Sequence, residues 1–303
     1  MEFKSVEDVQ ARLEAAGYIS SRSIATIVFL AQATLKPILV EGPAGVGKTE
    51  LAKAVARSLK RPLIRLQCYE GLDEAKALYE WEYAKQLLYT QMLKEKINDV
   101  VSGADSLTDA VDRIAAQENA FFSERFILPR PLLQAIGSKE PVTLLIDEID
   151  KSDPEFEAFL LEVLSDFQIS IPELGTRKAL SIPFVVLTSN DYRDMSDALK
   201  RRCLHLYIDY PDRNLELNIV KLKMPTVTDR LAEGLIDTIR NIRTLDLKKK
   251  PCISETLDWA QSMIALQIEE LSADIVADTL NVICKYRSDV DRVRDNLKKI
   301  IAV

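Results

Sequence analysis

The sequence predicts an α/β fold in which a five-stranded parallel sheet has helices on both faces and a small all-helical domain follows. Short apolar runs alternate with segments of helical periodicity, a pattern typical of a parallel sheet that is covered on both sides. The runs predicted to be strands are residues 37–40, 62–66, 142–146, 184–188 and 204–208. After Pro211 only helical patterns occur. We therefore expect a core of residues 1–210 and a helical domain of residues 211–303.

Helical patterns separate the first three strands. Residues 5–34 precede the first strand, and residues 51–59 lie between the first and the second. From Leu72 to about Glu118 the chain is rich in Glu, Lys, Ala and Leu, which predicts helix, with a break near residues 102–103. We assign the segment of residues 85–134 to structure or partner contact rather than to catalysis.

The helix after the third strand begins at Asp153-Pro154, a capping residue followed by proline at the first helical position. Two strand-like runs around Glu173-Leu174-Gly175 then predict a β-hairpin at residues 168–182 with an exposed tip. A short helix at residues 196–200 precedes the last strand. That strand contains the single histidine, His205, which we interpret as a strand residue rather than a catalytic base.

The C-terminal region is predicted to contain four helices and a solvated lysine-rich loop. The loop is residues 248–250, three consecutive lysines before a proline. The predicted helices are residues 226–243, 254–266, 273–286 and 289–300.

The composition favours a cytoplasmic protein. The 303 residues are 47% hydrophobic with a formal net charge of −7, which argues against a protein devoted to nucleic acid because such proteins carry a basic face. The cysteines are far apart and show no metal-ligand spacing, so we expect reduced, mostly buried thiols; they are Cys68, Cys203, Cys252 and Cys284. No signal peptide or bilayer-spanning apolar run is evident, so we expect no membrane partner.

A glycine-rich loop, GPAGVGKT, follows the first strand and precedes a helix, which is the context of a phosphate-binding loop. Its N–H groups and the positive end of the helix dipole favour a bound phosphate. Lys48 would reach the β- and γ-phosphates, and the Thr49 hydroxyl would hold Mg²⁺. The loop residues are Gly42, Pro43, Ala44, Gly45, Val46, Gly47, Lys48 and Thr49. The chain is therefore predicted to bind a nucleoside triphosphate.

Two carboxylates, Asp147 and Glu148, follow the third strand directly. At the carboxyl edge of a parallel sheet Asp147 would face the phosphate loop and support Mg²⁺, together with Thr49. Glu148 is positioned to orient and deprotonate an attacking water. A surface acidic pair is the alternative interpretation, which the apolar strand before the pair disfavours.

Polar groups that suit phosphoryl transfer also follow the fourth strand. Asn190 ends that strand, and its amide is suited to contact both the γ-phosphate and the attacking water. Arg201 and Arg202 end the short helix before the last strand. An arginine at this point is suited to a phosphoryl transition state, often in a neighbouring subunit's site; a solvated helix end is the structural alternative.

These motifs, in this order, resemble those of the AAA+ ATPases over essentially the whole chain. GPAGVGKT is similar to the Walker A motif, LLIDE to Walker B, Asn190 to sensor one, and Arg202, with Arg201 beside it, to the arginine finger. The resemblance implies a P-loop NTPase fold with a helical lid, hydrolysis of ATP to ADP with Mg²⁺, and a usually hexameric ring with ATP at each subunit interface.

The hairpin at residues 168–182 is similar to the helix-two insert of the MoxR branch of AAA+ proteins. Residues 69–88 and 253–263 look like the CoxD-like members of that branch. This resemblance implies chaperone-like maturation of a metalloenzyme, of the molybdenum hydroxylase or carbon monoxide dehydrogenase type. It also implies a partner with a von Willebrand factor A domain.

Two departures from the family pattern are present. Many MoxR proteins have Asn-Arg where this chain has Asp150-Lys151. The lid position at which related proteins carry a sensor-two arginine holds Ser254 or Glu255. The candidate replacements, among which the sequence does not choose, are Arg240, Arg243 and Lys250.

Other functions built on the same loop stay open at this stage. A nucleic-acid motor or loader is the main alternative, which the acidic composition and the lack of an aromatic-interleaved basic stripe argue against. A small-molecule kinase fits less well with the second carboxylate, Asn190 and the arginine pair. A nucleotide-gated scaffold without turnover is disfavoured by the intact Glu148.

Overall fold

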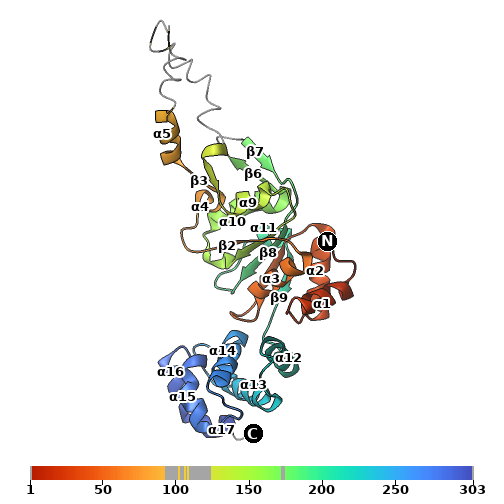
Figure 1. Ribbon diagram of the computed structural model, residues 1–303, viewed down its shortest axis with the longest axis vertical. Coiled ribbons are helices and arrows are strands. Elements are labelled where there is room, and N and C mark those ends of the chain that lie inside the picture. Colours follow the sequence, from red (N-terminus) through yellow and green to blue (C-terminus); the bar gives the residue numbers. More distant parts are fainter. Residues whose placement is uncertain are drawn as a thin grey trace.

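The computed structural model describes residues 2–92, 124–171 and 175–301, together with Ser102, Ser106 and Thr108. Figure 1 shows the sheet and its helices in the middle, a helical domain at the C-terminal end, and helix α5 at the opposite end. No helix in the described part of the chain is long and apolar enough to cross a membrane.

The core is built on a five-stranded sheet in which every neighbouring pair of strands is parallel. The strands are β1 (Ile38–Glu41), β2 (Leu63–Gln67), β5 (Thr143–Asp147), β8 (Phe184–Ser189) and β9 (Leu204–Tyr207). The predicted α/β fold with five parallel strands is therefore confirmed. The strand order is β2-β5-β8-β1-β9, so the carboxyl ends of β5, β8 and β1 lie side by side at one edge of the sheet.

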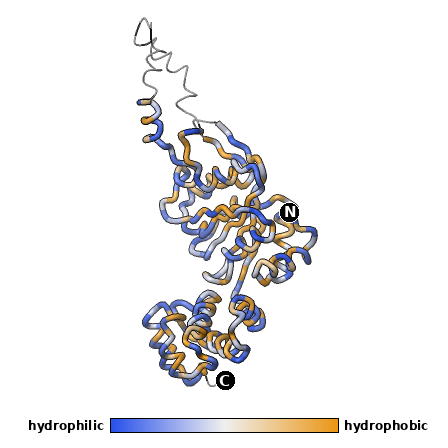
Figure 2. Tube along the Cα trace, in the orientation of Figure 1, coloured by the Kyte–Doolittle hydropathy of each residue, from blue (hydrophilic) through white to orange (hydrophobic). Residues whose placement is uncertain are grey.

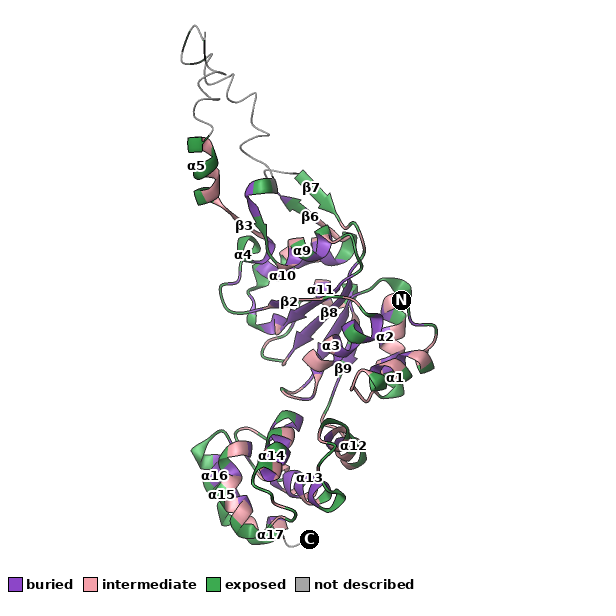
Figure 3. Cartoon of the chain, in the orientation of Figure 1, coloured by how far each residue is buried: buried purple, intermediate pink, exposed green. Residues whose placement is uncertain are grey.

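Alternating side chains of each central strand supply two separate hydrophobic clusters, one on each face of the sheet. Leu39, Leu144 and Leu187 pack on one face, against α4 (Glu74–Leu78), α9 (Pro131–Gly137), α10 (Pro154–Asp166) and α11 (Asp197–Arg202). Ile38, Leu145 and Val186 pack on the other, against α1 (Val6–Ala15), α2 (Arg22–Thr34) and α3 (Lys48–Leu59). Burial on both faces explains why these strands are continuously apolar and appear hydrophobic and buried in Figures 2 and 3.

The N-terminal region contains two helices, α1 and α2, where a single helical stretch was predicted over residues 5–34. The chain turns after α1 at Gly17, whose φ of +80° is a left-handed conformation. Glycine adopts this conformation without steric cost. Ser21 then caps α2 by accepting a hydrogen bond from the backbone N–H of Ile24 at 3.2 Å.

The region between β2 and β5 contains more than the helix that the composition predicts. After α4 the chain forms β3 (Tyr79–Trp81), α5 (Tyr83–Met92), the short 3₁₀ helix η1 (Glu124–Phe126) and β4 (Ile127–Pro129). β3 pairs antiparallel with β4, which is distant in sequence, so local periodicity gave no sign of it. The prediction of helix from Leu72 to about Glu118 was therefore wrong at β3. Much of the segment assigned as residues 85–134 lies outside the described residues.

The predicted hairpin is present as β6 (Gln168–Ile171) and β7 (Gly175–Lys178), which pair antiparallel. Its predicted tip residues Glu173 and Leu174 lie outside the described residues.

The C-terminal domain has its own hydrophobic cluster, centred on the fully buried Trp259 and separate from the two clusters of the sheet. Its helices are α12 (Arg213–Lys223), α13 (Asp229–Arg243), α14 (Ile253–Ala265), α15 (Ala273–Ile283), α16 (Arg287–Asp295) and α17 (Leu297–Ile301). The prediction missed α12, which is mostly polar and buries only Glu216 and Val220. It also merged α16 and α17 into one helix.

The cysteine thiols give a first testable prediction. All four are buried and unpaired, and burial raises the pKa of the Cys68 and Cys203 thiols to about 12 and that of Cys284 to about 11. Because the thiolate is the reactive form, we expect native protein to react with Ellman's reagent near neutral pH roughly 10²–10³-fold more slowly than urea-unfolded protein. Release of thionitrobenzoate measures both rates, and equal rates for the two states would contradict this burial.

Candidate active site

The glycine-rich loop connects β1 to the start of α3 and is in close contact with backbone and side chains around it. A β-carbon added to Gly42 would lie 2.0 Å from the carbonyl oxygen of Ile208. One added to Gly45 would lie 1.9 Å from the sulfur of Cys252 at the start of α14. Both glycines have positive φ, +142° and +75°. Glycine is therefore required at these two positions, and Gly45 brings the loop against the C-terminal domain.

Lys48 lies at the start of α3 and is folded back over the loop. Its Nζ donates hydrogen bonds of 2.6 Å to the carbonyl oxygens of Gly42 and Pro43. Burial lowers the pKa of Lys48, and the nearby carboxylates of Asp150, Asp147 and Glu148 partly oppose that effect. The side chain thus holds a buried amine beside several acidic groups.

Asp147 ends β5, and its carboxylate is buried beneath the loop with a full set of hydrogen-bond donors. Oδ1 accepts from the Thr49 hydroxyl at 3.0 Å and from the Thr188 hydroxyl at 2.5 Å. Oδ2 accepts from Nε of Arg65 at 3.0 Å. The pair of Thr49 hydroxyl and Asp147 carboxylate is an oxygen donor set of the kind that Mg²⁺ takes.

Glu148 begins the turn after β5, and its side chain is oriented by three donors. The Asn190 amide donates to Oε1 at 3.2 Å, while Gln67 and Lys151 donate to Oε2 at 2.9 and 2.7 Å. The hydrogen bond to Glu148 raises the pKa of Lys151. The backbone of Glu148 has φ +57°, an uncommon conformation for a non-glycine residue that is often found at functional sites.

A polar cavity of about 290 Å³ brings most of the predicted site residues together. Those that line it are Ala44, Gly45, Gly47, Lys48, Thr49, Asp147, Glu148 and Asn190. The lining also includes four residues that the sequence analysis did not assign to catalysis, namely Glu50, Lys53, Thr188 and Ser254. Gly42, Pro43 and Val46 belong to the loop but not to this lining. The sheet order explains the convergence, because the ends of β1, β8 and β5 are adjacent.

A second, largely apolar cavity of about 120 Å³ adjoins the first and shares Gly45, Gly47, Glu50 and Ser254 with it. Its other walls come from the chain before β1, the end of β9 and the C-terminal domain, and include Tyr18, Ile19, Ile208, Ile219 and Ile253. Burial raises the pKa of Tyr18. The sequence carried no signal for this cavity, because its residues come from segments that are far apart in the chain.

Ser254 is the residue of α14 that lines the polar cavity. None of the candidate replacements for a sensor-two arginine lines either cavity. Arg243 instead donates hydrogen bonds of 2.8 and 2.7 Å to the buried carboxylate of Glu216. Its guanidinium also lies 5.2 Å from the centre of the Tyr210 ring.

Arg201 and Arg202 lie at the end of α11, exposed and outside both cavities of their own chain. Arg202 donates to the Ser165 hydroxyl and, at 3.1 Å, to the carbonyl oxygen of Ala198. The structure therefore does not bring the two arginines to the phosphate loop of the same subunit. His205 lies in strand β9, as predicted, and contacts the carboxylate of Glu41.

The chain is similar to several known proteins. Residues 38–210 match the model of the ATPase family associated with various cellular activities (AAA). The gas vesicle ATPase GvpN1 of Halobacterium salinarum is 24% identical over 276 residues, which cover 88% of this chain and 74% of that protein. The gas vesicle ATPase GvpN of Haloferax mediterranei is 25% identical, with the same coverage. The RuvB Holliday junction branch migration motor of Thermotoga maritima matches with 18% identity and a TM-score of 0.46, covering 92% of this chain and 72% of RuvB.

Proposed function

Because this chain belongs to the AAA family of ATPases, we propose that it couples ATP hydrolysis in an oligomeric ring to the remodelling of a client protein. The observation that carries the proposal is the polar cavity in which a phosphate loop, Asp147, Glu148 and Asn190 converge. The chain is an ATPase by family, and the roles given to its residues below are our proposal.

The two adjoining cavities fit the two parts of ATP. The polar one, with the loop N–H groups and Lys48, suits a triphosphate. The apolar one, with Tyr18, Ile208 and Ile253 among its walls, suits the nucleobase. Thr49 and Asp147 would hold Mg²⁺, which would neutralise negative charge on the phosphates.

Glu148 is the proposed general base. Its carboxylate lies at the cavity beside Asn190, so it can accept a proton from a water molecule that attacks the γ-phosphate. Gln67 and Lys151 hold its other oxygen, which fixes the orientation of the carboxylate. Asn190 is proposed to position the water and the γ-phosphate with the amide that now contacts Glu148.

Arg202 is proposed to complete the site of a neighbouring subunit, with Arg201 beside it. Its exposed position outside its own cavity supports a contact in trans, as does its place at the end of α11. The ring would be hexameric if it follows the usual arrangement of the resembled family.

Replacing Lys48 with alanine is expected to weaken ATP binding by roughly 10–10²-fold, because a charged hydrogen bond to phosphate is lost. Isothermal titration with a non-hydrolysable ATP analogue measures the affinity. Lys53→Ala is the matched control, because Lys53 lines the same cavity. Its amine is partly exposed and lies 3.9 Å from the carboxylate of Glu50. Equal ATP affinities of the two variants would contradict a phosphate-binding role for Lys48.

The proposed client is a metalloenzyme of the molybdenum hydroxylase or carbon monoxide dehydrogenase type, together with a partner carrying a von Willebrand factor A domain. The proposal rests on the MoxR-type and CoxD-like sequence features at residues 69–88 and 253–263. A second candidate client is a gas vesicle component, because the gas vesicle ATPases match 88% of this chain.

Affinity capture separates these clients. Glu148→Gln protein loaded with ATP is used as bait, and Lys48→Ala protein is the control that should not hold the client in an ATP-dependent way. Specific recovery of a metalloenzyme subunit or a von Willebrand factor A protein supports the maturation function. Recovery of gas vesicle proteins supports the second candidate, and recovery of a nucleic-acid complex would overturn both.

A further inference from the structure

A short turn after β8 fixes the backbone of Asn190, the residue proposed to position the attacking water. Two N–H groups of this turn are bonded to one carboxylate oxygen. Oδ2 of Asp150 accepts from the backbone N–H of Asn190 and from that of Tyr192, each at 3.0 Å. Asp150 lies in η2 (Ile149–Lys151), the 3₁₀ helix that follows β5. One side chain after β5 therefore holds the chain after β8.

The middle residue of this turn has an uncommon backbone conformation. Asp191 has φ +67°, which lies in the left-handed region that few non-glycine residues adopt. The two N–H groups bonded to Asp150 lie on either side of it, and its own N–H donates to the Ser189 hydroxyl at 3.1 Å. The next anchor along the chain is Glu157, which accepts from the N–H of Ser196 at 3.1 Å. The shape of the turn therefore depends on Asp150.

Asp150 is buried although one of its carboxylate oxygens has no partner. The residue is 1% exposed, and its Oδ1 accepts no hydrogen bond within the described part of the chain. Burying an unpaired carboxylate oxygen costs free energy, so stability alone does not favour aspartate at this position. Costly features of this kind are expected at functional sites.

The backbone position of Asn190 determines where its amide lies. Its Nδ2 donates to Oε1 of Glu148 at 3.2 Å, and both residues line the polar cavity. Asp150 does not line that cavity. We propose that Asp150 is a positioning residue for ATP hydrolysis, which sets the Asn190 amide against Glu148 by anchoring the turn after β8. This inference rests on the proposed function and on the role given there to Asn190.

Asp150 also acts on Lys48 through its charge. Burial lowers the pKa of Lys48, and among the carboxylates that oppose this effect Asp150 has the largest influence. An effect of Asp150 through Lys48 would change the affinity for ATP. An effect through Asn190 would instead change turnover at saturating ATP, so the two are measured separately.

Asp150→Ala is expected to lower turnover at saturating ATP by roughly 10²-fold, because small displacements of positioning groups have effects of this size. Affinity for a non-hydrolysable ATP analogue should stay within about threefold of that of the unaltered protein. Asp150→Asn keeps an acceptor oxygen and loses only the assistance of charge, so it should recover turnover to within about tenfold. Phosphate release and isothermal titration provide the two measurements.

A double-variant cycle distinguishes positioning from a merely structural role. If Asp150 acts through Asn190, adding Asp150→Ala to Asn190→Ala protein lowers turnover by less than about threefold. An equal loss in both backgrounds, or normal turnover by Asp150→Ala alone, would overturn the proposal. Normal turnover by Asn190→Ala alone would remove the role proposed for Asn190 and this inference with it, so the two failures are distinguishable.

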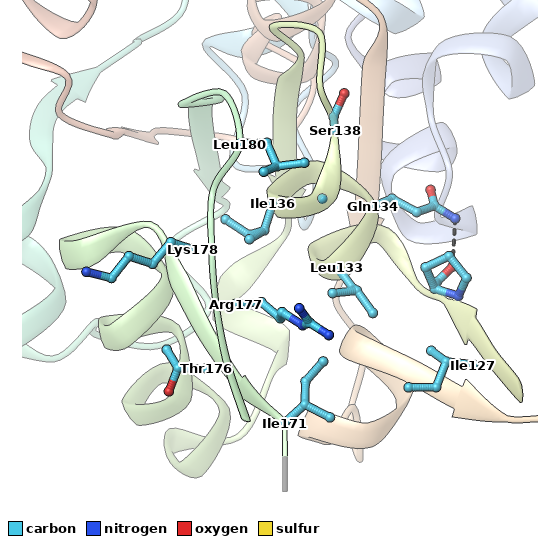
Figure 4. A pocket seen from close by; sticks show the side chains of 12 residues that line it. Ile127, Leu133, Gln134, Ile136, Ser138, Ile171, Thr176, Arg177, Lys178 and Leu180 are labelled. Carbon is cyan, nitrogen blue, oxygen red and sulfur yellow. Dashed lines mark hydrogen bonds between the residues drawn. The ribbon is translucent and has the colours of Figure 1, made fainter. Parts of the chain in front are cut away.

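A variant remote from the polar cavity controls for loss of stability. A larger, mainly apolar cavity of about 770 Å³ lies beside α9 and shares no lining residue with the polar cavity. Figure 4 shows Ile136 among its lining side chains. Ile136 is fully buried, so Ile136→Ala is expected to lower the free energy of unfolding and to change turnover little. A loss of turnover in Ile136→Ala equal to that in Asp150→Ala would attribute the effect to instability and overturn the proposal.

Binding of the ATP analogue shows that a variant has folded with its site intact. If Asp150→Ala does not bind it, Asp150→Ser takes its place in the cycle. Loss of binding by both variants would assign Asp150 to the fold rather than to the reaction, and would overturn the proposal.

Discussion

Glu148→Gln protein is expected to hydrolyse ATP roughly 10²–10⁴ times more slowly than the unaltered protein while still binding ATP, because the general base is lost. Glutamine preserves the shape of the side chain and can still accept the hydrogen bond from Asn190. It cannot take a proton from water. Phosphate release under saturating ATP measures turnover, and titration with ATP measures affinity.

Glu50→Gln is the matched control for this experiment. Glu50 also lines the polar cavity, but its carboxylate is ion-paired to Arg57 at 2.7 Å. Its replacement should change turnover far less. Normal turnover by Glu148→Gln, or an equal loss in both variants, would sink the assignment of Glu148 as the base.

Arg202→Ala should lower ATP turnover by about 10³–10⁵-fold in assembled protein, as expected for an arginine that stabilises a phosphoryl-transfer transition state. ATP binding should change little, because Arg202 lies outside the cavity of its own chain. Arg201→Ala is the neighbouring control, since Arg201 lies beside it on the same exposed helix end. The two arginines are thereby tested separately.

Mixing two inactive variants tests whether the arginine acts between subunits. Arg202→Ala protein keeps an intact phosphate loop, and Lys48→Ala protein keeps an intact Arg202. If the arginine acts in trans, mixed rings contain interfaces at which both intact parts meet, and activity returns. An arginine that acted within its own subunit would give no recovery at any mixing ratio.

The order of motifs along the sequence was enough to predict the sheet and most of the polar cavity. The phosphate loop follows β1, Asp147 and Glu148 lie at the end of β5, and Asn190 follows β8. Parallel strands present such residues at one edge. Arg65 and Gln67 were not predicted, although they contact Asp147 and Glu148. They lie on β2, which reaches the site only because β2 pairs with β5.

Features that depend on distant pairing, or that bury few side chains, were also missed. The pairing of β3 with β4 joins two three-residue strands across a long stretch of chain, and such short strands carry little periodic signal. Helix α12 buries only two residues, so its pattern resembles that of a loop. The apolar cavity at Tyr18 draws its walls from three regions, and no local motif can describe it.

The contact between Gly45 and Cys252 couples the free energy of nucleotide binding to the position of the C-terminal domain. No side chain fits between the phosphate loop and the start of α14, so the loop and the C-terminal domain share a steric boundary. We therefore expect a nucleotide that alters the loop to change the preferred position of that domain. By thermodynamic linkage, a displacement of the domain then changes the affinity for the nucleotide in return. If the chain remodels a client as proposed, tension from that client would change the dissociation constant for ATP or ADP.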